Sequence, residues 1–230
     1  MKHFKDFAEK IGVSFKNEDL LKQAFTHRSY LNENPDWITS HNERLEFLGD
    51  AVLELAASDF LFKKFPQKPE GELTSLRAAL VNADSLAESA EDLDINNYLL
   101  LSRGEAKDVG RGRLYILANT YEAIIGAIYL DQGYGPAEKF IEKTLLLKIE
   151  EVLEKGLYRD AKSMFQEKSQ EIVQLTPAYK VLEEWGPDHD KQFRVGVFLG
   201  EELVAEGEGP SKQLAEQEAA KSGLKIKKWD

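Results

Sequence analysis

The sequence predicts an all-α domain followed by a small α+β domain, on three observations. Over most of residues 1–155, apolar side chains recur at the three- and four-residue spacing of helices that bury one face. The character changes after Lys155-Gly156, and residues 193–199 alternate apolar and polar side chains as a half-buried strand does. The change follows Gly156, so we expect the helical domain at residues 1–155, a linker at 156–159 and the second domain at 160–230.

The composition and charge exclude several classes of protein. The 230 residues include 30 basic and 41 acidic side chains, a net charge of −11, and no cysteine. The lack of cysteine excludes disulfides, a thiol nucleophile and cysteine-ligated metal sites. No apolar run reaches the ~20 residues that span a bilayer, and the N-terminus lacks a secretory apolar segment, so we expect a cytoplasmic protein with no membrane partner. The negative charge argues against a general polyanion binder, so a nucleic-acid site would need a local basic face or metal ions.

Turn-rich breakers divide the first domain into helices. They lie at residues 34–36, 66–71, 103–113 and 133–136, where proline and glycine gather. The predicted core positions between them are Leu20, Leu21, Ala24, Leu45, Leu48, Val52, Leu55, Ala56, Phe65, Ile124, Ile125 and Ile128, with the aromatic residues Phe7, Phe15, Phe25, Phe60, Phe62 and Tyr129.

We predict that the second domain has the order helix, strand, strand, strand, helix. We predict the first helix at residues 160–175, ended by Thr176-Pro177, and strands at 179–185, 193–199 and 203–208. Ser211 is a typical N-cap for the closing helix.

Acidic residues share one face of a predicted helix. Glu43, Glu46 and Asp50 are spaced i, i+3 and i+7, which places them within an arc of roughly 60°. Such stacked charges repel one another unless a cation lies between them, and carboxylate oxygens are the ligands of Mg²⁺. Gly49 lowers helix propensity beside Asp50, so we expect another backbone to pass close to it.

A second polar pair, Asn119 and Glu122, lies one turn apart on an otherwise apolar helix. An inward-facing pair needs a partner, and the two helices together could supply one site. The residues of that site would be Glu46, Asp50, Asn119 and Glu122. Two other interpretations stay open from the residues alone: the acids are solvated surface groups, or they pair with Arg44 or Arg77.

Four segments resemble the ribonuclease III family. Residues 42–53 (NERLEFLGDAVL) match its signature almost word for word. Residues 20–30 (LLKQAFTHRSY), 70–78 (EGELTSLRA) and 122–131 (EAIIGAIYLD) look like its N-terminal motif, the start of its middle helix and its last acidic motif. A twelve-residue match that lies at the expected distance from three other motifs is far more specific than a lone motif.

The resemblance implies an endonuclease that cuts both strands of double-stranded RNA and processes structured rRNA and mRNA precursors. It implies Mg²⁺-assisted hydrolysis, with Mn²⁺ able to substitute and no small-molecule cofactor, leaving 5′-phosphate and 3′-hydroxyl ends. The implied metal-binding residues are Glu46, Asp50, Asn119 and Glu122. Asp50 and Glu122 are the catalytic pair by the same likeness, and Glu43 and Arg77 lie around the scissile phosphate. The likeness also implies that Phe47 helps form the interface of a homodimer.

Asn119 departs from the family, which usually has aspartate there. An amide oxygen ligates a hard cation without charge, so we expect a weaker metal site and a higher Mg²⁺ requirement. The alternative function is a protein that binds double-stranded RNA without cutting it. A helical-bundle metalloprotein unrelated to RNA is disfavoured because the sequence has no Glu-x-x-His pair.

The second domain resembles a double-stranded RNA-binding domain. The likeness implies that Gln166 contacts the minor groove, that His189 reaches into a groove from its loop, and that Lys212 contacts phosphate at a helix N-terminus. Gln213 stands where the family often has a second basic residue, so we expect modest, salt-sensitive affinity. We expect Lys227 and Lys228 to lie in a frayed, solvated tail.

Overall fold

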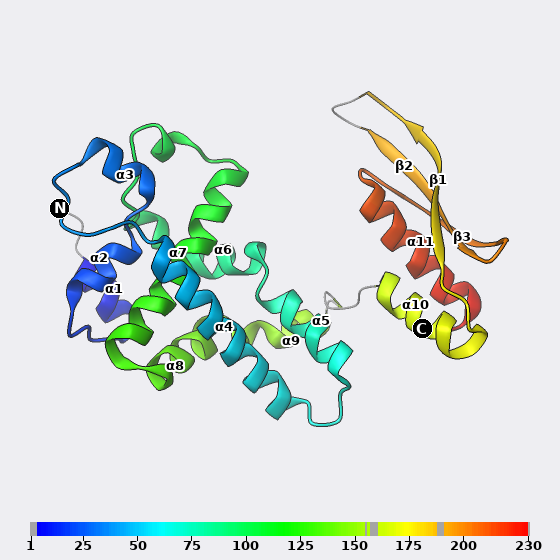
Figure 1. Ribbon diagram of the computed structural model, residues 1–230, viewed down its shortest axis with the longest axis horizontal. Helices are drawn as coiled ribbons and strands as arrows, with labels where there is room; N and C mark the ends of the chain where they lie inside the picture. The colour runs from blue at the N-terminus through cyan, green and yellow to red at the C-terminus, as the bar shows by residue number, and fades with distance from the viewer. Residues whose placement is uncertain (1–3, 155, 157–160, 188–190, 230) are drawn as a thin grey trace. The chain divides into compact units, whose positions relative to one another are not determined.

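In the computed structural model the chain divides into two compact units, Met1–Tyr158 and Arg159–Asp230 (Figure 1). The structure describes residues 4–154, 156, 161–187 and 191–229. Each unit has its own hydrophobic core. The predicted linker falls mostly outside the described residues, so its bounds stay a prediction.

The first unit is helical throughout its described part, as predicted. Its helices are α1 (Phe4–Ile11), α2 (Glu18–Ala24), α3 (Arg28–Glu33), α4 (Glu43–Lys64), α5 (Glu70–Leu80), α6 (Ala83–Asp92), α7 (Arg111–Gln132), α8 (Tyr134–Thr144) and α9 (Ile149–Glu154). Short 3-10 turns lie at Ile95–Asn97, Glu105–Lys107 and Leu146–Lys148.

The long helices α4 and α7 cross at the centre of this unit. A Cβ on Gly49 of α4 would overlap the carbonyl oxygen of Glu122 and lie 2.9 Å from the backbone nitrogen of Gly126. A Cβ on Gly126 would in turn overlap the carbonyl oxygen of Leu45. The expectation of a close backbone at Gly49 is therefore confirmed, and two glycines set the distance between the helices.

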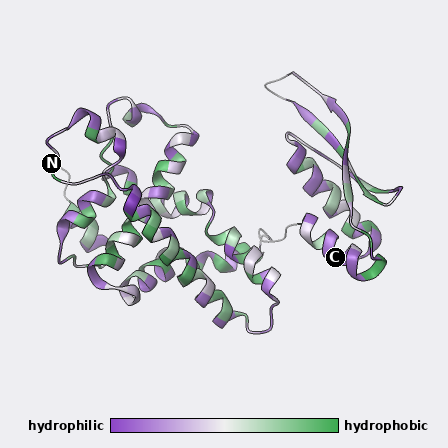
Figure 2. Ribbon diagram, viewed as in Figure 1, coloured by the Kyte–Doolittle hydropathy of each residue, from purple (hydrophilic) through white to green (hydrophobic). Residues whose placement is uncertain are grey.

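Hydrophobic and hydrophilic residues alternate around the helices of this unit (Figure 2).

Two predicted core positions on α4 are wrong. Leu55 is 58% exposed and Phe62 is 71% exposed, whereas Phe7 and Phe25 are fully buried. The α4 helix carries apolar residues on more than one face, so its periodicity alone did not reveal which face turns inward. The neighbouring elements cover the face of α4 that carries Leu45, Val52, Ala56 and Leu61, and these residues are buried.

The second unit packs two helices against a sheet. Its elements are α10 (Ala161–Val173), β1 (Ala178–Trp185), β2 (Gln192–Leu199), β3 (Glu202–Gly209) and α11 (Lys212–Lys227). The sheet is an antiparallel meander of order β1-β2-β3, in which Val195 pairs with Val181 and Gly207. Val195 and Val197 are fully buried, as the alternation predicted.

The C-terminal end of α11 corrects one expectation. Lys227 is not in a frayed tail, because it closes the helix and its Nζ lies 2.8 Å from Oε1 of Glu202 at the start of β3. Lys228 follows as the left-handed C-cap.

Candidate functional site

The α4–α7 crossing brings acidic residues from two helices together. Glu46 and Asp50 flank Gly49, and Asn119 and Glu122 lie on the part of α7 that passes over it. The side-chain amide of Asn119 hydrogen-bonds to the Glu46 carboxylate, and Glu46 and Asp50 both lie close enough to Glu122 to act on it electrostatically. The side chains predicted to share one site are therefore neighbours, and their catalytic roles stay a prediction.

Burial and neighbouring carboxylates shift the pKa of two acids at this crossing. Burial, and then the charges of Asp50 and Glu46, raise the pKa of Glu122 to about 8. Burial raises the pKa of Glu46 too, with Glu43 and Asp50 adding to the effect. Raised pKa values caused by burial and like charges are typical of functional sites.

Glu54 belongs to the same acidic group and was missed from the sequence. It contributes further negative charge at Glu122, and it lies one turn beyond Asp50 on α4, so the i, i+4 spacing was the available signal. Nε of Arg77, on α5, lies 2.9 Å from Oε2 of Glu54, and its Nη1 donates to Oγ of Ser58 at 2.7 Å. Arg77 is thus held at the edge of the acidic group.

This contact bears on the interpretations left open by the sequence. Arg77 pairs with Glu54, an acid of this group, and Arg44 is exposed. Glu122 is partly buried and its pKa is raised, so it is not a solvated surface acid, whereas Asp50 is exposed.

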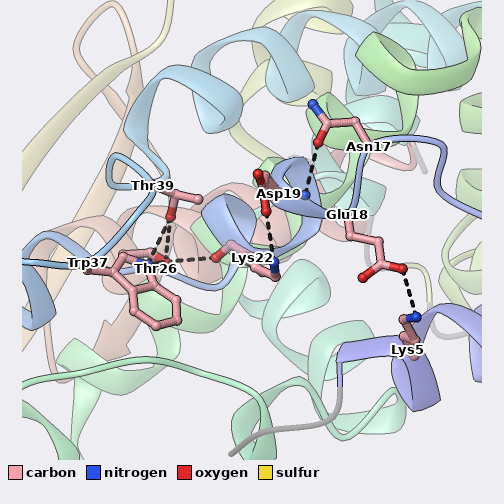
Figure 3. Close-up of polar contacts among 8 residues, drawn as sticks. All are labelled: Lys5, Asn17, Glu18, Asp19, Lys22, Thr26, Trp37 and Thr39. Carbon is pink, nitrogen blue, oxygen red and sulfur yellow. Dashed lines mark hydrogen bonds and ion pairs between the residues drawn. The ribbon is translucent and has the colours of Figure 1, made fainter.

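A polar cluster fixes the start of α4 (Figure 3). Nε1 of Trp37 donates to Oγ1 of Thr39 at 2.9 Å and to Oγ1 of Thr26 at 3.1 Å. The backbone N–H of Asn42 donates to the carbonyl oxygen of Thr26 at 2.9 Å, and Asn42 itself is buried. These bonds place Glu43, the first residue of α4, relative to the rest of the unit.

Glu43 is exposed and lies beside two basic side chains. Its Oε1 is 3.6 Å from Nη1 of Arg28, and its Oε2 is 3.8 Å from Nδ1 of His41. It lies one turn before Glu46, at the outer end of the acidic face. His27 is the N-cap of α3, and its Nδ1 accepts from the N–H of Ser29.

The donors of this region suit a hard divalent cation. Among the described residues, no three His, Asp or Glu side chains lie close enough, as they stand, to hold a metal ion together. Magnesium needs fewer protein ligands, since it commonly binds one or two carboxylates and keeps several waters. The feature of this region that such a cation would neutralise is the grouping of carboxylates around Glu122.

In the second unit, the start of α11 is built as predicted. Oγ of Ser211 accepts from the N–H of Leu214 at 3.3 Å, which caps the helix. Nζ of Lys212 lies 3.2 Å from Oε1 of Glu184 on β1. Gln166 is exposed on α10 and lines a hollow shared with Gln213 of α11. His189 lies outside the described residues, so its role stays a prediction.

The outer face of α4 exposes large apolar side chains. Phe47 is 80% exposed, and Leu55 and Phe62 follow it on the same helix.

Within the part of the chain that the structure describes, no helix is both long enough and apolar enough to cross a membrane.

Two family models match the two units separately. A ribonuclease-III-like model matches residues 17–149, and a double-stranded RNA binding motif matches residues 161–227. The chain belongs to the ribonuclease III family. It is therefore an endoribonuclease whose helical nuclease domain precedes an α-β-β-β-α RNA-binding domain, as the sequence predicted.

Relatives in this family match over nearly the full chain. Ribonuclease 3 of Nitratiruptor sp. is 47% identical over 99% of this chain and 98% of its own length. Ribonuclease 3 of Enterococcus faecalis is 46% identical over 96% of this chain and 95% of its own. Among solved structures, the nuclease domain of ribonuclease III from Campylobacter jejuni is 40% identical, covers 62% of this chain and 98% of its own, and superposes with a TM-score of 0.56. That nuclease domain has a flexible region involved in dimer formation.

Proposed function

We propose that this ribonuclease III family member cleaves double-stranded RNA by Mg²⁺-assisted hydrolysis, leaving 5′-phosphate and 3′-hydroxyl ends. The observation that carries the proposal is the meeting of Glu46 and Asp50 with Asn119 and Glu122 at the glycine crossing of α4 and α7. The family's RNA-binding motif in the second unit supports duplex RNA as the substrate class.

The acidic residues have separate roles in this proposal. Asp50 and Glu122 hold the cation, Glu46 completes the coordination and Asn119 adds an uncharged oxygen. When bound, Mg²⁺ or Mn²⁺ supplies charge neutralisation at the phosphate and activation of a water molecule. Glu122 gives up its proton on metal binding, so the affinity for the cation rises with pH.

The groups around these ligands position the phosphate. Arg77, held by Glu54 and Ser58, keeps guanidinium donors at the edge of the acidic group, and its side chain is 37% exposed. Glu43 lies on the opposite side, next to Arg28. In the second unit, Gln166, His189 and Lys212 contact the duplex across its minor groove and phosphates.

A homodimer completes the proposal. Phe47 leaves most of its ring uncovered on α4 and is the residue we place at the two-fold interface. Two copies of the site related by this axis would cut opposite strands. The substrates we propose are structured rRNA and mRNA precursors in the cytoplasm.

Cleavage of a labelled RNA duplex tests the proposal. Fragments with 5′-phosphate ends are expected in Mg²⁺, with Ca²⁺ supporting binding alone, and Glu122→Gln should bind without cutting. A shifted band that never yields fragments, even in saturating Mg²⁺, supports the second candidate, a non-cleaving RNA-binding protein. The observation favouring that candidate is Asn119, whose amide occupies a position where an additional carboxylate would strengthen the metal site.

A further inference from the structure

One carboxylate in the second unit lies between two lysines. Glu184 is near the end of β1, Lys191 directly precedes β2, and Lys212 is the first residue of α11. Oε2 of Glu184 is 2.9 Å from Nζ of Lys191, and Oε1 is 3.2 Å from Nζ of Lys212. Each carboxylate oxygen therefore faces one ammonium group.

The surroundings hold the two lysines on the same side of the unit. Their ammonium groups lie 5.7 Å and 5.5 Å from the centre of the Phe193 ring, within the range of cation–π attraction. Hydrogen bonds from both lysines lower the pKa of Glu184, so it is ionised at neutral pH. All three charged side chains are partly exposed, which leaves them open to a ligand in solution.

Glu184 contacts the ammonium groups that a phosphate bound at the start of α11 would also contact. Lys212 and the N-cap Ser211 begin α11, where the N–H groups and helix dipole favour an anion. A phosphate approaching this end must take the two ammonium groups away from Glu184 or share them with it. The carboxylate also repels the phosphate directly.

Building on the proposed RNA binding of this unit, we propose that Glu184 is an internal competitor for the RNA backbone. It lowers the affinity for duplex RNA and reduces the salt dependence of binding, because part of the positive charge of Lys191 and Lys212 is already neutralised. Phosphate binding by these lysines is thereby weakened without any change in the groups that contact the minor groove.

The adjacent residue Glu183 provides a matched control. Neighbouring residues of a strand point to opposite faces, and Glu183 pairs with Arg194 of β2, with 2.9 Å between its Oε2 and Nη1 of Arg194. Glu183→Gln and Glu184→Gln remove the same charge from the same strand. Only Glu184→Gln removes the carboxylate charge that faces Lys191 and Lys212.

Binding of the full-length chain to an RNA duplex, in EDTA and over a range of salt concentrations, tests the inference. A duplex of about 30 base pairs exceeds the ~16 that such a domain covers. Glu184→Gln should tighten binding roughly two- to fivefold, the range expected for exposed ion pairs. It should also steepen the salt dependence by up to about 0.9 in log–log slope, the contribution of one phosphate contact. Glu183→Gln should change neither quantity beyond the small effect of net charge.

A double-mutant cycle with Lys212→Met identifies the cause. The gain from Glu184→Gln should shrink when Lys212 is absent, because fewer ammonium groups remain to be released. Equal gains in the two glutamine variants, or weaker binding in Glu184→Gln, would overturn the inference while leaving RNA binding intact. A wild-type chain that fails to bind the duplex would instead overturn the proposed function, and this inference with it.

Discussion

Replacing Glu122 by glutamine should stabilise the metal-free protein at neutral and alkaline pH. The pKa of Glu122 is about 8 in the folded chain, against an ordinary value of 4.5. Between these values the folded state binds the proton more tightly than the unfolded state, so the wild-type protein loses stability as the pH rises. Glutamine keeps the size and the hydrogen-bonding groups of the protonated acid and removes this loss.

The size of this stability gain follows from the pH interval over which the unfolded state ionises Glu122 and the folded state does not. Each pH unit of that interval is worth about 1.36 kcal/mol, so the difference at pH 7 is at most about 3.4 kcal/mol. It falls to nearly zero below pH 4.5, where the side chain is protonated in both states. Because Asp50 is exposed and can turn outward, the measured gain should lie below that ceiling. For a domain of this size, ~1 kcal/mol corresponds to about 2–4 °C in Tm.

Thermal unfolding followed by circular dichroism, in EDTA and from pH 5 to pH 8, measures the prediction. The Tm of Glu122→Gln should exceed that of the wild type by an amount that grows with pH. Added Mg²⁺ should raise the Tm of the wild type more than that of the variant, because the variant lacks a ligand. Glu138→Gln, on α8 and away from the crossing, is the control. Equal Tm values at pH 8, or a gap independent of pH, would refute the electrostatic reasoning about Glu122.

Three further outcomes are expected. Asn119→Asp should lower the Mg²⁺ concentration for half-maximal duplex cleavage, because it adds a charged ligand; an unchanged midpoint would contradict the weakened site. Gly49→Ala should cost about 1–3 kcal/mol in urea unfolding, since its Cβ would overlap the Glu122 backbone; Gly135→Ala, with open space around its Cβ, should be nearly neutral, and equal losses would count against the crossing. Phe47→Asp should shift sedimentation from dimer to monomer, whereas Val109→Asp, at another highly exposed apolar position, should leave the dimer intact; a dimer in both variants would exclude Phe47 from the interface.

Much of the candidate site could be predicted from spacing and motif. The i, i+3, i+7 pattern of Glu43, Glu46 and Asp50 places them on one face of any helix, and the need for a close backbone at Gly49 follows from its lack of a side chain. The resemblance of residues 42–53 to the ribonuclease III family indicated that Asn119 and Glu122 of α7 belong to the same site. The structure adds Glu54, which the same spacing extended by one turn would have found.

Other features depended on contacts between distant segments. No periodicity indicates that Arg77 pairs with Glu54, 23 residues earlier in the sequence, or that Glu184 lies between Lys191 and Lys212. The same limit explains the errors at Leu55 and Phe62. A helix with apolar residues on several faces buries those that its neighbours cover, and the neighbours are chosen by the whole fold.

By itself the sequence determined the types of element and the order of the two domains, and it predicted the residues that we propose as ligands of a cation, because these depend on local propensity, periodicity and side-chain chemistry. Only the tertiary structure decided how strongly those residues interact. The packing of Gly49 against α7 removes water from Glu122 and brings other carboxylates near it. The pKa of that acid therefore arises from burial and proximity, two quantities that exist only once the chain has folded.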